Sequence, residues 1–501
     1  VIQEQSKPDM NKVIVIGSGI GGLATAARLV SKGYDVTIFE SSNHTGGKIH
    51  SFDLDNYRFD AGPSLFTLPN LVDELFLLND ENPREYFNYK KKEIHCKYFW
   101  NDGTKINAFS DIARFLKEVK DKLNVSQDTL LKYLKRSQKK YELTEPIFLK
   151  KSLHKLSSYF SKNTLKALFH LRIFDFNKSL NETNKKYLKE PHLVQLYNRY
   201  ATYNGSNPYE TSGIMTLIQH LESHYGTWVP NGGMVQISSS ITDLIKSKGV
   251  KIRLNSNVDE IIVKNKQVQG IISNGQVFTS DYVVSNMDIF FTYKKLLKEF
   301  DMPKRVSKSE RSSSALIFYW GVKRSFPQLD LHNILFSDDY RDEFESIFKN
   351  REVSNDPTIY INITSKDVPN DAPKNCENWF VMINAPYDSE QSWKDITLSL
   401  RKIIIQKINA ILKTDIEKYI QAEKIYTPQT IETKTQSYKG ALYGTSSNSM
   451  LSAFLRHPNF SKDIKNLYFC GGSVHPGGGI PLCLLSAKIV SDQFKGVSNA
   501  K

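Results

Sequence analysis

Three glycines near the amino end of the chain, Gly17, Gly19 and Gly22, have the spacing G-x-G-x-x-G. Gly17 permits a tight turn, Gly19 lets backbone N–H groups approach a pyrophosphate, and Gly22 allows a helix to pack closely on a strand. Glu40 follows at about the 20-residue spacing of a carboxylate that accepts a hydrogen bond from a ribose hydroxyl. Together, these four residues have the chemistry to hold a dinucleotide.

The elements around these residues support that chemistry. Residues 13–16 are apolar and predict a strand, residues 23–29 predict a helix, and a second apolar run at residues 35–39 leads directly to Glu40. A glycine match of this kind also arises by chance or in a purely structural turn, and an acidic residue after a strand is usually only solvated. The order of strand, turn, helix and second strand favours nucleotide binding.

Composition places the chain among globular proteins. It has 501 residues, enough for two or three domains, of which 40% are hydrophobic and 24% charged. No apolar run approaches the ~18 residues of a transmembrane helix, the first residues show no signal-peptide pattern, and Met10 is the expected native start. The cysteines have no metal-binding spacing, so we expect a protein of the reducing cytoplasm that has no disulfide scaffold and no metal site. They are Cys96, Cys376, Cys470 and Cys483.

Glycine-rich stretches recur further along the chain. Residues 41–48 end in a glycine pair followed by a lysine, and residues 57–64 are an aromatic strand that breaks at a Gly-Pro turn. Residues 466–481 place a strand before a glycine-rich loop and a helix, an arrangement whose backbone N–H groups can cradle the polar edge or ribityl chain of a flavin. Each loop taken alone is equally consistent with a flexible turn.

Taken in order, the stretches G-S-G-I-G-G, E, G-G-K and F-D-A-G-P-S resemble the amino end of the FAD-dependent carotenoid desaturases and their amine-oxidase-like relatives. The W-x-P-x-G-G stretch at residues 228–233 and the loop H-P-G-x-G-x-P at residues 475–481 resemble the middle and the end of the same family. In that family the glycine pair normally precedes arginine, so Lys48 is a conservative departure.

The resemblance implies an α/β fold with a Rossmann-type, amine-oxidase-like FAD-binding domain assembled from the discontinuous segments 11–85, 226–290 and 465–497. It implies a helical substrate or membrane-associated region at 86–225 and a substrate-binding mixed sheet with helices at 291–464. Val258 is expected to contact the adenine side of FAD through its backbone. The residues expected to bind FAD are Gly17, Gly19, Ile20, Gly21, Gly22, Glu40, Ser41, Gly47, Lys48, Gly62, Pro63, Ser64, Val258, Asn286, Gly472, Gly479, Ile480 and Pro481.

The second half of the chain alternates strand-like runs, such as residues 314–322, with helical runs, such as residues 395–412. This alternation suits a sheet with helices on one side, which would offer a platform for an apolar ligand. Residues 332–340 with 356–360 look like carotenoid desaturases of bacterial type. Residues 58–67 with the carboxyl-terminal loop look most like the 1-hydroxycarotenoid 3,4-desaturases within that family.

The reaction that the resemblance implies removes two hydrogens from a CH2–CH2 unit beside a polyene, with hydride transfer to flavin and loss of a proton. Such chemistry needs no catalytic triad and no metal. Asp60 and His475 are candidate proton acceptors, but neither is assigned a catalytic role. The expected partners are a lipophilic carotenoid and, as electron acceptor, oxygen or a quinone.

Several alternatives stay open. Within the family they are a phytoene or dehydrosqualene-type desaturase, a carotenoid terminal oxidase and an isomerase. Another substrate class would make the protein a flavin amine oxidase, which would act on an aqueous amine. A basic dinucleotide-dependent binding or regulatory protein is the non-enzymatic alternative.

The positive charge bears on location. A net charge of +14 would attract nucleic acid or anionic lipid, or reflect no partner at all. Residues 146–172 alternate apolar residues with lysines at helical spacing, which describes either a basic amphipathic helix pair on an anionic membrane or an ordinary helix with a solvated face. A membrane-dissolved substrate favours the first reading, so we expect a cytoplasmic protein associated peripherally with the membrane and not with nucleic acid.

Overall fold

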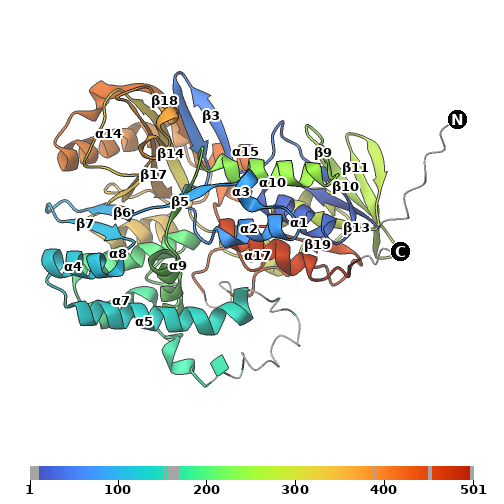
Figure 1. The fold of residues 1–501 in the computed structure, drawn as a ribbon, viewed down its shortest axis with the longest axis horizontal. Helices are drawn as coiled ribbons and strands as arrows, with labels where there is room; N and C mark the ends of the chain where they lie inside the picture. The colour runs from blue at the N-terminus through green and yellow to red at the C-terminus, as the bar shows by residue number, and fades with distance from the viewer. Residues whose placement is uncertain are drawn as a thin grey trace.

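The computed structural model places two sheets next to each other, with helices packed around both (Figure 1). No helix in the described part of the chain is long and apolar enough to cross a membrane. The described residues are 11–149, 151, 154, 164, 166, 167, 169–388, 390–449 and 454–496.

The first sheet is parallel and has the strand order β19-β13-β1-β2-β9. Its strands come from three separated stretches of the chain, which confirms a Rossmann-type fold assembled from discontinuous segments. The strands are β1 (Lys12–Ile16), β2 (Asp35–Phe39), β9 (Lys251–Arg253), β13 (Tyr282–Ser285) and β19 (Leu467–Phe469).

Both faces of this sheet are covered, and the alternation of side chains along β1 shows how. Val13 and Val15 join the core under α1, α2, α10 and α17, whereas Ile14 and Ile16 pack toward the small antiparallel sheet β10-β11-β12. Burial on both sides explains why β1 is a continuous apolar run. These elements are α1 (Ile20–Val30), α2 (Asn70–Leu77), α10 (Val235–Ser247), α17 (Ile480–Ser491), β10 (Val258–Lys264), β11 (Gln267–Ser273) and β12 (Gln276–Thr279).

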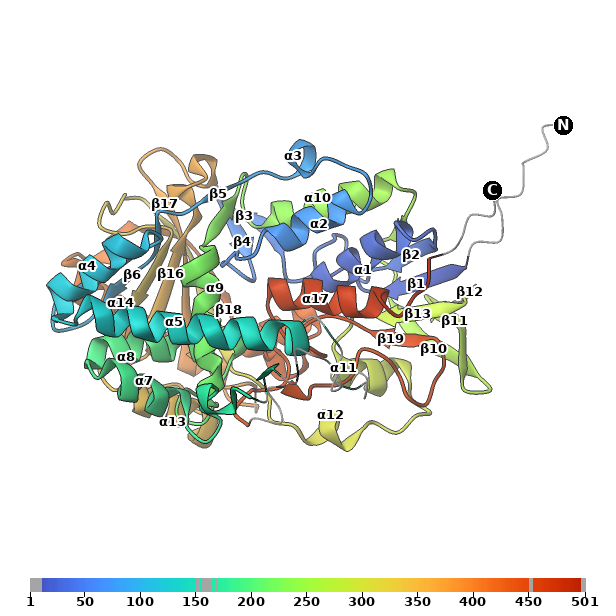
Figure 2. The same ribbon diagram turned by 60° about the horizontal axis from the view of Figure 1, so that its bottom comes forward.

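The second sheet is mixed and has the order β18-β14-β17-β16-β15-β6-β7, antiparallel throughout except where β15 pairs with β6. The helix α14 (Trp393–Leu412) covers one face, and the other face turns toward the interior of the molecule (Figure 2). The strands are β6 (Ile94–Phe99), β7 (Lys105–Phe109), β14 (Ser314–Val322), β15 (His332–Leu335), β16 (Ile359–Ile363), β17 (Glu377–Ala385) and β18 (Ile420–Tyr426).

The strand β14 divides its side chains between the two faces. Leu316, Phe318 and Trp320 pack under α14, whereas Ile317 and Tyr319 point to the interior face. Because successive side chains of a strand alternate, a strand buried on both faces can serve a core and a ligand platform at once. The expected sheet with a helix on one side is present, and its use as a platform for a ligand stays a prediction.

Residues 86–225 are less uniformly helical than we expected, because they begin by supplying β6 and β7 to the second sheet. After these strands the chain is mostly helical, and α5 crosses the front of the molecule in Figure 2. Most of the amphipathic stretch 146–172 lies outside the described residues. The helices are α4 (Ile112–Leu123), α5 (Gln127–Thr144), α7 (Leu180–Leu188), α8 (Pro191–Asn198) and α9 (Ile218–Tyr225).

The contact between α1 and β1 generates the first prediction. A β-carbon placed on Gly22 would lie 2.1 Å from the carbonyl oxygen of Gly17, a backbone atom that cannot swing aside. We expect Gly22→Ala to destabilise the protein by about 1–3 kcal/mol, as overpacked positions do. Gly496→Ala is the control, because a β-carbon there meets nothing within 4 Å. Equal unfolding midpoints in urea for the two variants would contradict this close packing.

Candidate active site

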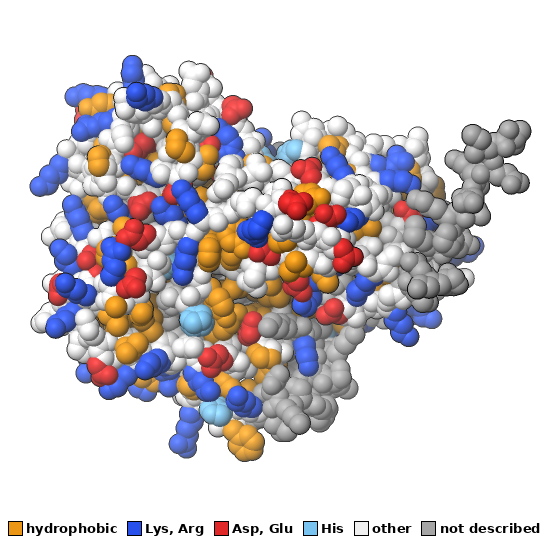
Figure 3. All heavy atoms as spheres, viewed as in Figure 1, with side chains coloured by type: hydrophobic (Ala, Val, Ile, Leu, Met, Phe, Trp, Pro, Cys, Tyr) orange, Lys and Arg blue, Asp and Glu red, His pale blue; other side chains and the backbone are white. Residues whose placement is uncertain are grey.

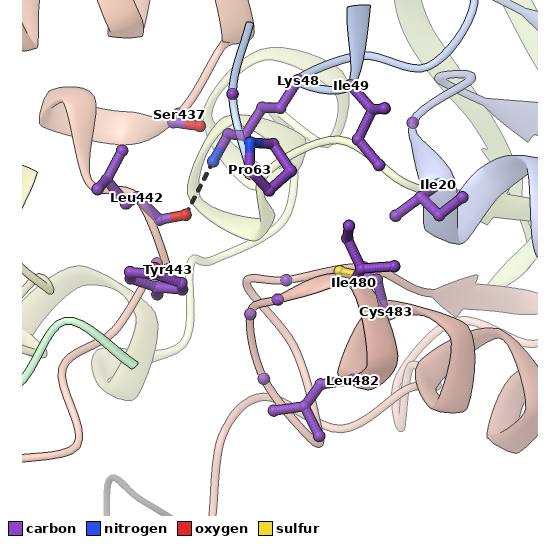
Figure 4. Close-up of a pocket in the computed structure, with 18 of the residues that line it drawn as sticks. Ile20, Lys48, Ile49, Pro63, Ser437, Leu442, Tyr443, Ile480, Leu482 and Cys483 are labelled. Carbon is purple, nitrogen blue, oxygen red and sulfur yellow. Dashed lines mark hydrogen bonds between the residues drawn. The ribbon is translucent and has the colours of Figure 1, made fainter. Parts of the chain in front are cut away.

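One cavity of about 590 Å³ runs from the carboxyl edge of the parallel sheet to the interior face of the mixed sheet. Figure 4 shows one part of it, where Ile20, Lys48, Pro63 and Ile480 come from separate segments and surround a common space. All the residues expected to bind FAD line this cavity except Gly22, which packs behind it. The structure therefore brings the predicted residues together, while their contact with FAD stays a prediction.

The amino end of α1 opens onto the cavity without a side-chain cap. Its N-cap residue, Gly19, makes no side-chain hydrogen bond, and the first turn carries no acidic residue. The first N–H groups of such a helix are unpaired donors at the positive end of its dipole, which suits a phosphate group. Gly17, with φ at +91°, makes the turn that aims them.

Glu40 lies at the end of β2 and is nearly buried. One carboxylate oxygen accepts hydrogen bonds from the backbone N–H and the hydroxyl of Ser18, both at 2.7 Å, and the other accepts from the Ser42 N–H at 2.8 Å. Burial would raise the pKa of Glu40, but these hydrogen bonds hold it below its usual value. The carboxylate is thus charged at neutral pH and retains acceptor capacity for a ribose hydroxyl.

The loops at residues 17–22, 46–48, 62–64 and 471–481 are called the cofactor loops below. Asn286 lies where the first and the last of them approach each other. Its side chain lies 2.7 Å and 2.8 Å from where β-carbons on Gly19 and Gly21 would be, and 2.4 Å from one on Gly471. Its amide also donates to the Cys470 carbonyl oxygen at 3.1 Å. The glycines are therefore required by packing against Asn286 as well as by any ligand.

The carboxyl-terminal loop offers a second uncapped helix end. Gly479, with φ at +104°, is the N-cap of α17 and makes no side-chain hydrogen bond. A β-carbon on Gly479 would meet no protein atom within 4 Å, because the residue borders the cavity. Backbone donors that border open space fit the polar part of a flavin, so the residues present fit FAD.

A half-buried lysine and a buried arginine lie beside this loop. Lys48 Nζ donates to the Leu442 carbonyl at 3.0 Å, as Figure 4 shows, and Arg456 Nη1 donates to the Tyr443 carbonyl at 2.7 Å. Burial lowers the pKa of Lys48, and it lowers that of Arg456 to about 10. Arg456 stays charged at neutral pH, so this part of the cavity favours electron-rich ligands. Because the Lys48 amine faces Leu442, its contact with FAD stays a prediction.

The opposite wall of the cavity is the interior face of the mixed sheet. It is apolar and aromatic, and helices α5 and α9 with their neighbouring loops close it from the other side. Such a surface buries a long hydrocarbon and excludes water. Its side chains include Ile317, Tyr319, Ile334, Phe380, Met382 and Tyr426.

A charged network from the helical side of the cavity lies against this apolar wall. Arg199 donates to the hydroxyl oxygens of Tyr98 at 2.6 Å and Tyr203 at 3.0 Å, and its guanidinium lies 3.6 Å from the carboxylate of Glu222. Burial would raise the pKa of Glu222, and the charge of Arg199 keeps it below its usual range. Because Arg199 and Glu222 stay ionised and hydrogen-bonded, the pair can remain buried beside the apolar wall.

The two candidate proton acceptors have different surroundings. Asp60 does not line the cavity; it pairs with Arg58 at 2.8 Å and accepts from the Met234 N–H at 2.7 Å, which fixes the start of α10. His475 lines the cavity, but burial lowers its pKa to about 4, so it is a weak base at neutral pH. Neither geometry assigns a catalytic base.

The sequence patterns did not single out Arg199, Glu222 or His332 as cavity residues. Strand alternation could have indicated His332, because it shares the interior face with Ile334. The pairing of Arg199 with Glu222 leaves no local signal. Among the described residues, no group of three or more His, Cys, Asp or Glu side chains is placed to hold a metal.

Comparison with known proteins defines the class. Residues 20–493 match the family model described as flavin containing amine oxidoreductase, so the protein belongs to this family of FAD-dependent oxidoreductases. An oxidoreductase from Methanosarcina mazei has a similar fold, with a TM-score of 0.62 and 16% identity over 96% of this chain and 100% of that one. A triple mutant of putrescine oxidase is similar with a TM-score of 0.62 and 12% identity over 97% and 98% of the two chains.

Sequence relatives narrow the assignment to the carotenoid desaturases within that family. The chain is 54% identical to 1-hydroxycarotenoid 3,4-desaturase from Flavobacterium sp. (strain P99-3), over 96% of this chain and 99% of the relative. It is 33% identical to 4,4'-diapolycopene oxygenase from Methylomonas sp, over 97% and 98% of the two chains. The resemblance stated from the motifs is confirmed, and so is FAD as the cofactor.

The hydrogen bonds of Glu40 generate a pH prediction. We expect Glu40→Gln to lower the free energy of unfolding at pH 7 by about 1.5–3 kcal/mol, because charge-assisted hydrogen bonds are lost. Since the folded-state pKa is lowered, the carboxylate stabilises the protein above its unfolded-state pKa, and this contribution disappears as the pH falls through the folded-state value. Urea unfolding at several pH values should show the difference shrinking below about pH 4. A difference that does not depend on pH would contradict this role.

Proposed function

We propose that the protein is a 1-hydroxycarotenoid 3,4-desaturase, which introduces a double bond at the 3,4 position of an acyclic, 1-hydroxylated end group. The observation that carries this proposal is the single cavity that joins the dinucleotide loops to an apolar sheet face. The 54% identical relative supports the same substrate class.

In this reaction the substrate loses two hydrogens and gains one carbon–carbon double bond. A bound flavin supplies the two-electron acceptor that takes up a hydride, and a proton leaves from the neighbouring carbon. The apolar side chains of the mixed sheet bury the polyene, exclude water and hold the C3–C4 bond near the cofactor loops. The chain thus acts chiefly by position.

The proposal gives the cavity residues their roles. We assign FAD binding to the residues that the sequence predicted for it. Their common position around one cavity supports this assignment. Segments 11–85, 226–290 and 465–497 hold the cofactor, and segments 86–225 and 291–464 hold the carotenoid. The pairing of β6 with β15 supports a substrate site shared by the last two segments.

Oxygenation of a carotenoid is the second candidate, because the 33% identical relative is an oxygenase. An amine substrate fits less well. The buried Arg456 would repel a protonated amine, and the wall opposite it is apolar.

Mass analysis of the products separates these reactions. Purified FAD-loaded protein is incubated in air with a 1-hydroxylated acyclic carotenoid, with its non-hydroxylated counterpart or with a diamine. We expect a product two hydrogens lighter from the hydroxylated carotenoid and slower conversion of the counterpart. A product that gains oxygen would favour the oxygenase, and turnover of the diamine alone would exclude carotenoid desaturation.

We further propose that the protein associates peripherally with a membrane, from which it would draw its lipophilic substrate. Phe169 is 86% exposed and Leu171 is 49% exposed, and the exposed cations Lys166 and Arg172 lie within three residues of one or the other in the sequence. Apolar side chains beside cations suit the surface of an anionic bilayer. On the face shown in Figure 3, lysine and arginine are interspersed with acidic side chains and do not form the single basic stripe of a nucleic-acid site.

Vesicle sedimentation tests this association. The double variant Phe169→Ser, Leu171→Ser should bind vesicles of phosphatidylcholine and phosphatidylglycerol at least about tenfold more weakly than the wild type, because buried apolar area is lost. The control is Val277→Ser, Leu398→Ser, which removes side chains that are 63% and 57% exposed elsewhere on the molecule. Equal binding by both double variants would exclude this contact.

A further inference from the structure

One buried histidine on the cavity wall has an incomplete set of hydrogen bonds. His332 begins β15, is 4% exposed and points to the interior face of the mixed sheet. Its Nδ1 lies 2.7 Å from the hydroxyl oxygen of Tyr360 and 3.3 Å from Nδ2 of Asn362. Its Nε2 is buried and has no hydrogen-bond partner among the described residues.

The neighbours determine which nitrogen carries the proton. Asn362 Nδ2 also donates to the Leu331 carbonyl at 3.0 Å, and an amide nitrogen only donates, so its 3.3 Å contact with Nδ1 of His332 is a hydrogen bond in the tautomer whose Nδ1 accepts. Burial lowers the pKa of His332 to about 4, so the ring is neutral at pH 7. A neutral ring that accepts at Nδ1 carries its proton at Nε2. His332 therefore presents a buried N–H donor to the cavity.

The cavity around this donor indicates what it binds. The neighbouring side chains on the same face, Ile334, Phe380 and Met382, offer no strong acceptor, and a plain hydrocarbon offers none either. A buried donor without a partner is costly, so the ligand that completes this site carries a neutral oxygen. Two further buried atoms lining the cavity, Nε2 of His95 and the hydroxyl of Tyr340, also lack partners among the described residues and add to the polarity of this region.

The position of His332 relates this oxygen to the reacting bond. The Tyr360 hydroxyl that contacts His332 also lies 2.7 Å from the hydroxyl oxygen of Ser64, which directly follows Gly62 and Pro63 of the cofactor loops. In a 1-hydroxylated end group, a single carbon separates the hydroxyl-bearing carbon from the C3–C4 bond. A group that binds this hydroxyl must therefore lie close to the cofactor loops, as His332 does.

We propose that His332 Nε2–H donates a hydrogen bond to the hydroxyl oxygen of the substrate, with Tyr360 and Asn362 holding the ring in the required tautomer. This inference rests on the proposed function and adds the residue that selects the end group. A substrate without the hydroxyl leaves the donor buried and unpaired, and a site of this kind rejects such an analogue far better than an apolar pocket does.

The test compares two substrates across three variants. His332→Phe removes the donor but keeps a planar ring, His332→Gln keeps an N–H donor near the position of Nε2, and Met382→Leu alters the same wall without a polar change. The readout is kcat/KM for the 1-hydroxylated carotenoid divided by that for its non-hydroxylated counterpart. We expect His332→Phe to reduce this ratio about tenfold or more, with His332→Gln restoring much of it and Met382→Leu keeping the wild-type ratio.

The possible failures are distinguishable. If the wild type does not desaturate the hydroxylated carotenoid, the proposed function is wrong; if it does and His332→Phe keeps the wild-type ratio, the histidine assignment is wrong. A second measurement needs no variant that might misfold. In wild-type protein labelled with ¹⁵N-histidine, a hydroxylated but non-reactive analogue should shift one buried Nε2–H resonance, whereas the deoxy analogue should not. Identical spectra with the two analogues would overturn the proposal.

Discussion

The structure depends on how closely the two glycine-rich segments that follow β1 and β19 approach each other beside the carboxyl end of β13, which Asn286 follows. Asn286 fills the space between them, and side chains on Gly19, Gly21 or Gly471 would collide with it. This contact ties together segments that are far apart in the sequence. It also leaves the amino ends of α1 and α17 uncapped and directed at the same cavity, where backbone N–H groups can bind a dinucleotide.

The mixed sheet supplies the other half of the site by using its two faces differently. One face packs under α14 and forms a core, and the other lines the cavity. The cavity face is mostly apolar, so each polar group on it needs a reason. Beside this face, the charges of Arg199 and Glu222 neutralise each other, whereas His332 on the face itself keeps a donor for a ligand. We infer that the cofactor loops determine the type of reaction by holding FAD, and that the mixed sheet determines which substrate binds.

The parts of this arrangement that depend on neighbouring residues in the sequence were predictable. Glycine spacing and the acid at the end of β2 predicted the cofactor loops, and a strand-like run predicted β14 over residues 314–322. Sequence reasoning could not predict that β6 and β7 join the second sheet, because parallel pairing with β15 depends on residues more than two hundred positions away. The tautomer of His332 is equally beyond a local pattern, since Tyr360 and Asn362 determine it.

The central claim is that one cavity brings FAD and a 1-hydroxylated carotenoid together for desaturation. The most direct test is a single turnover without oxygen, in which FAD-loaded protein is mixed with the carotenoid while flavin absorbance and product are followed together. We expect oxidised-flavin absorbance to disappear in step with the formation of one equivalent of a product two hydrogens lighter. Product formation while the flavin stays oxidised, or a product that forms only when oxygen is admitted and contains it, would contradict the account.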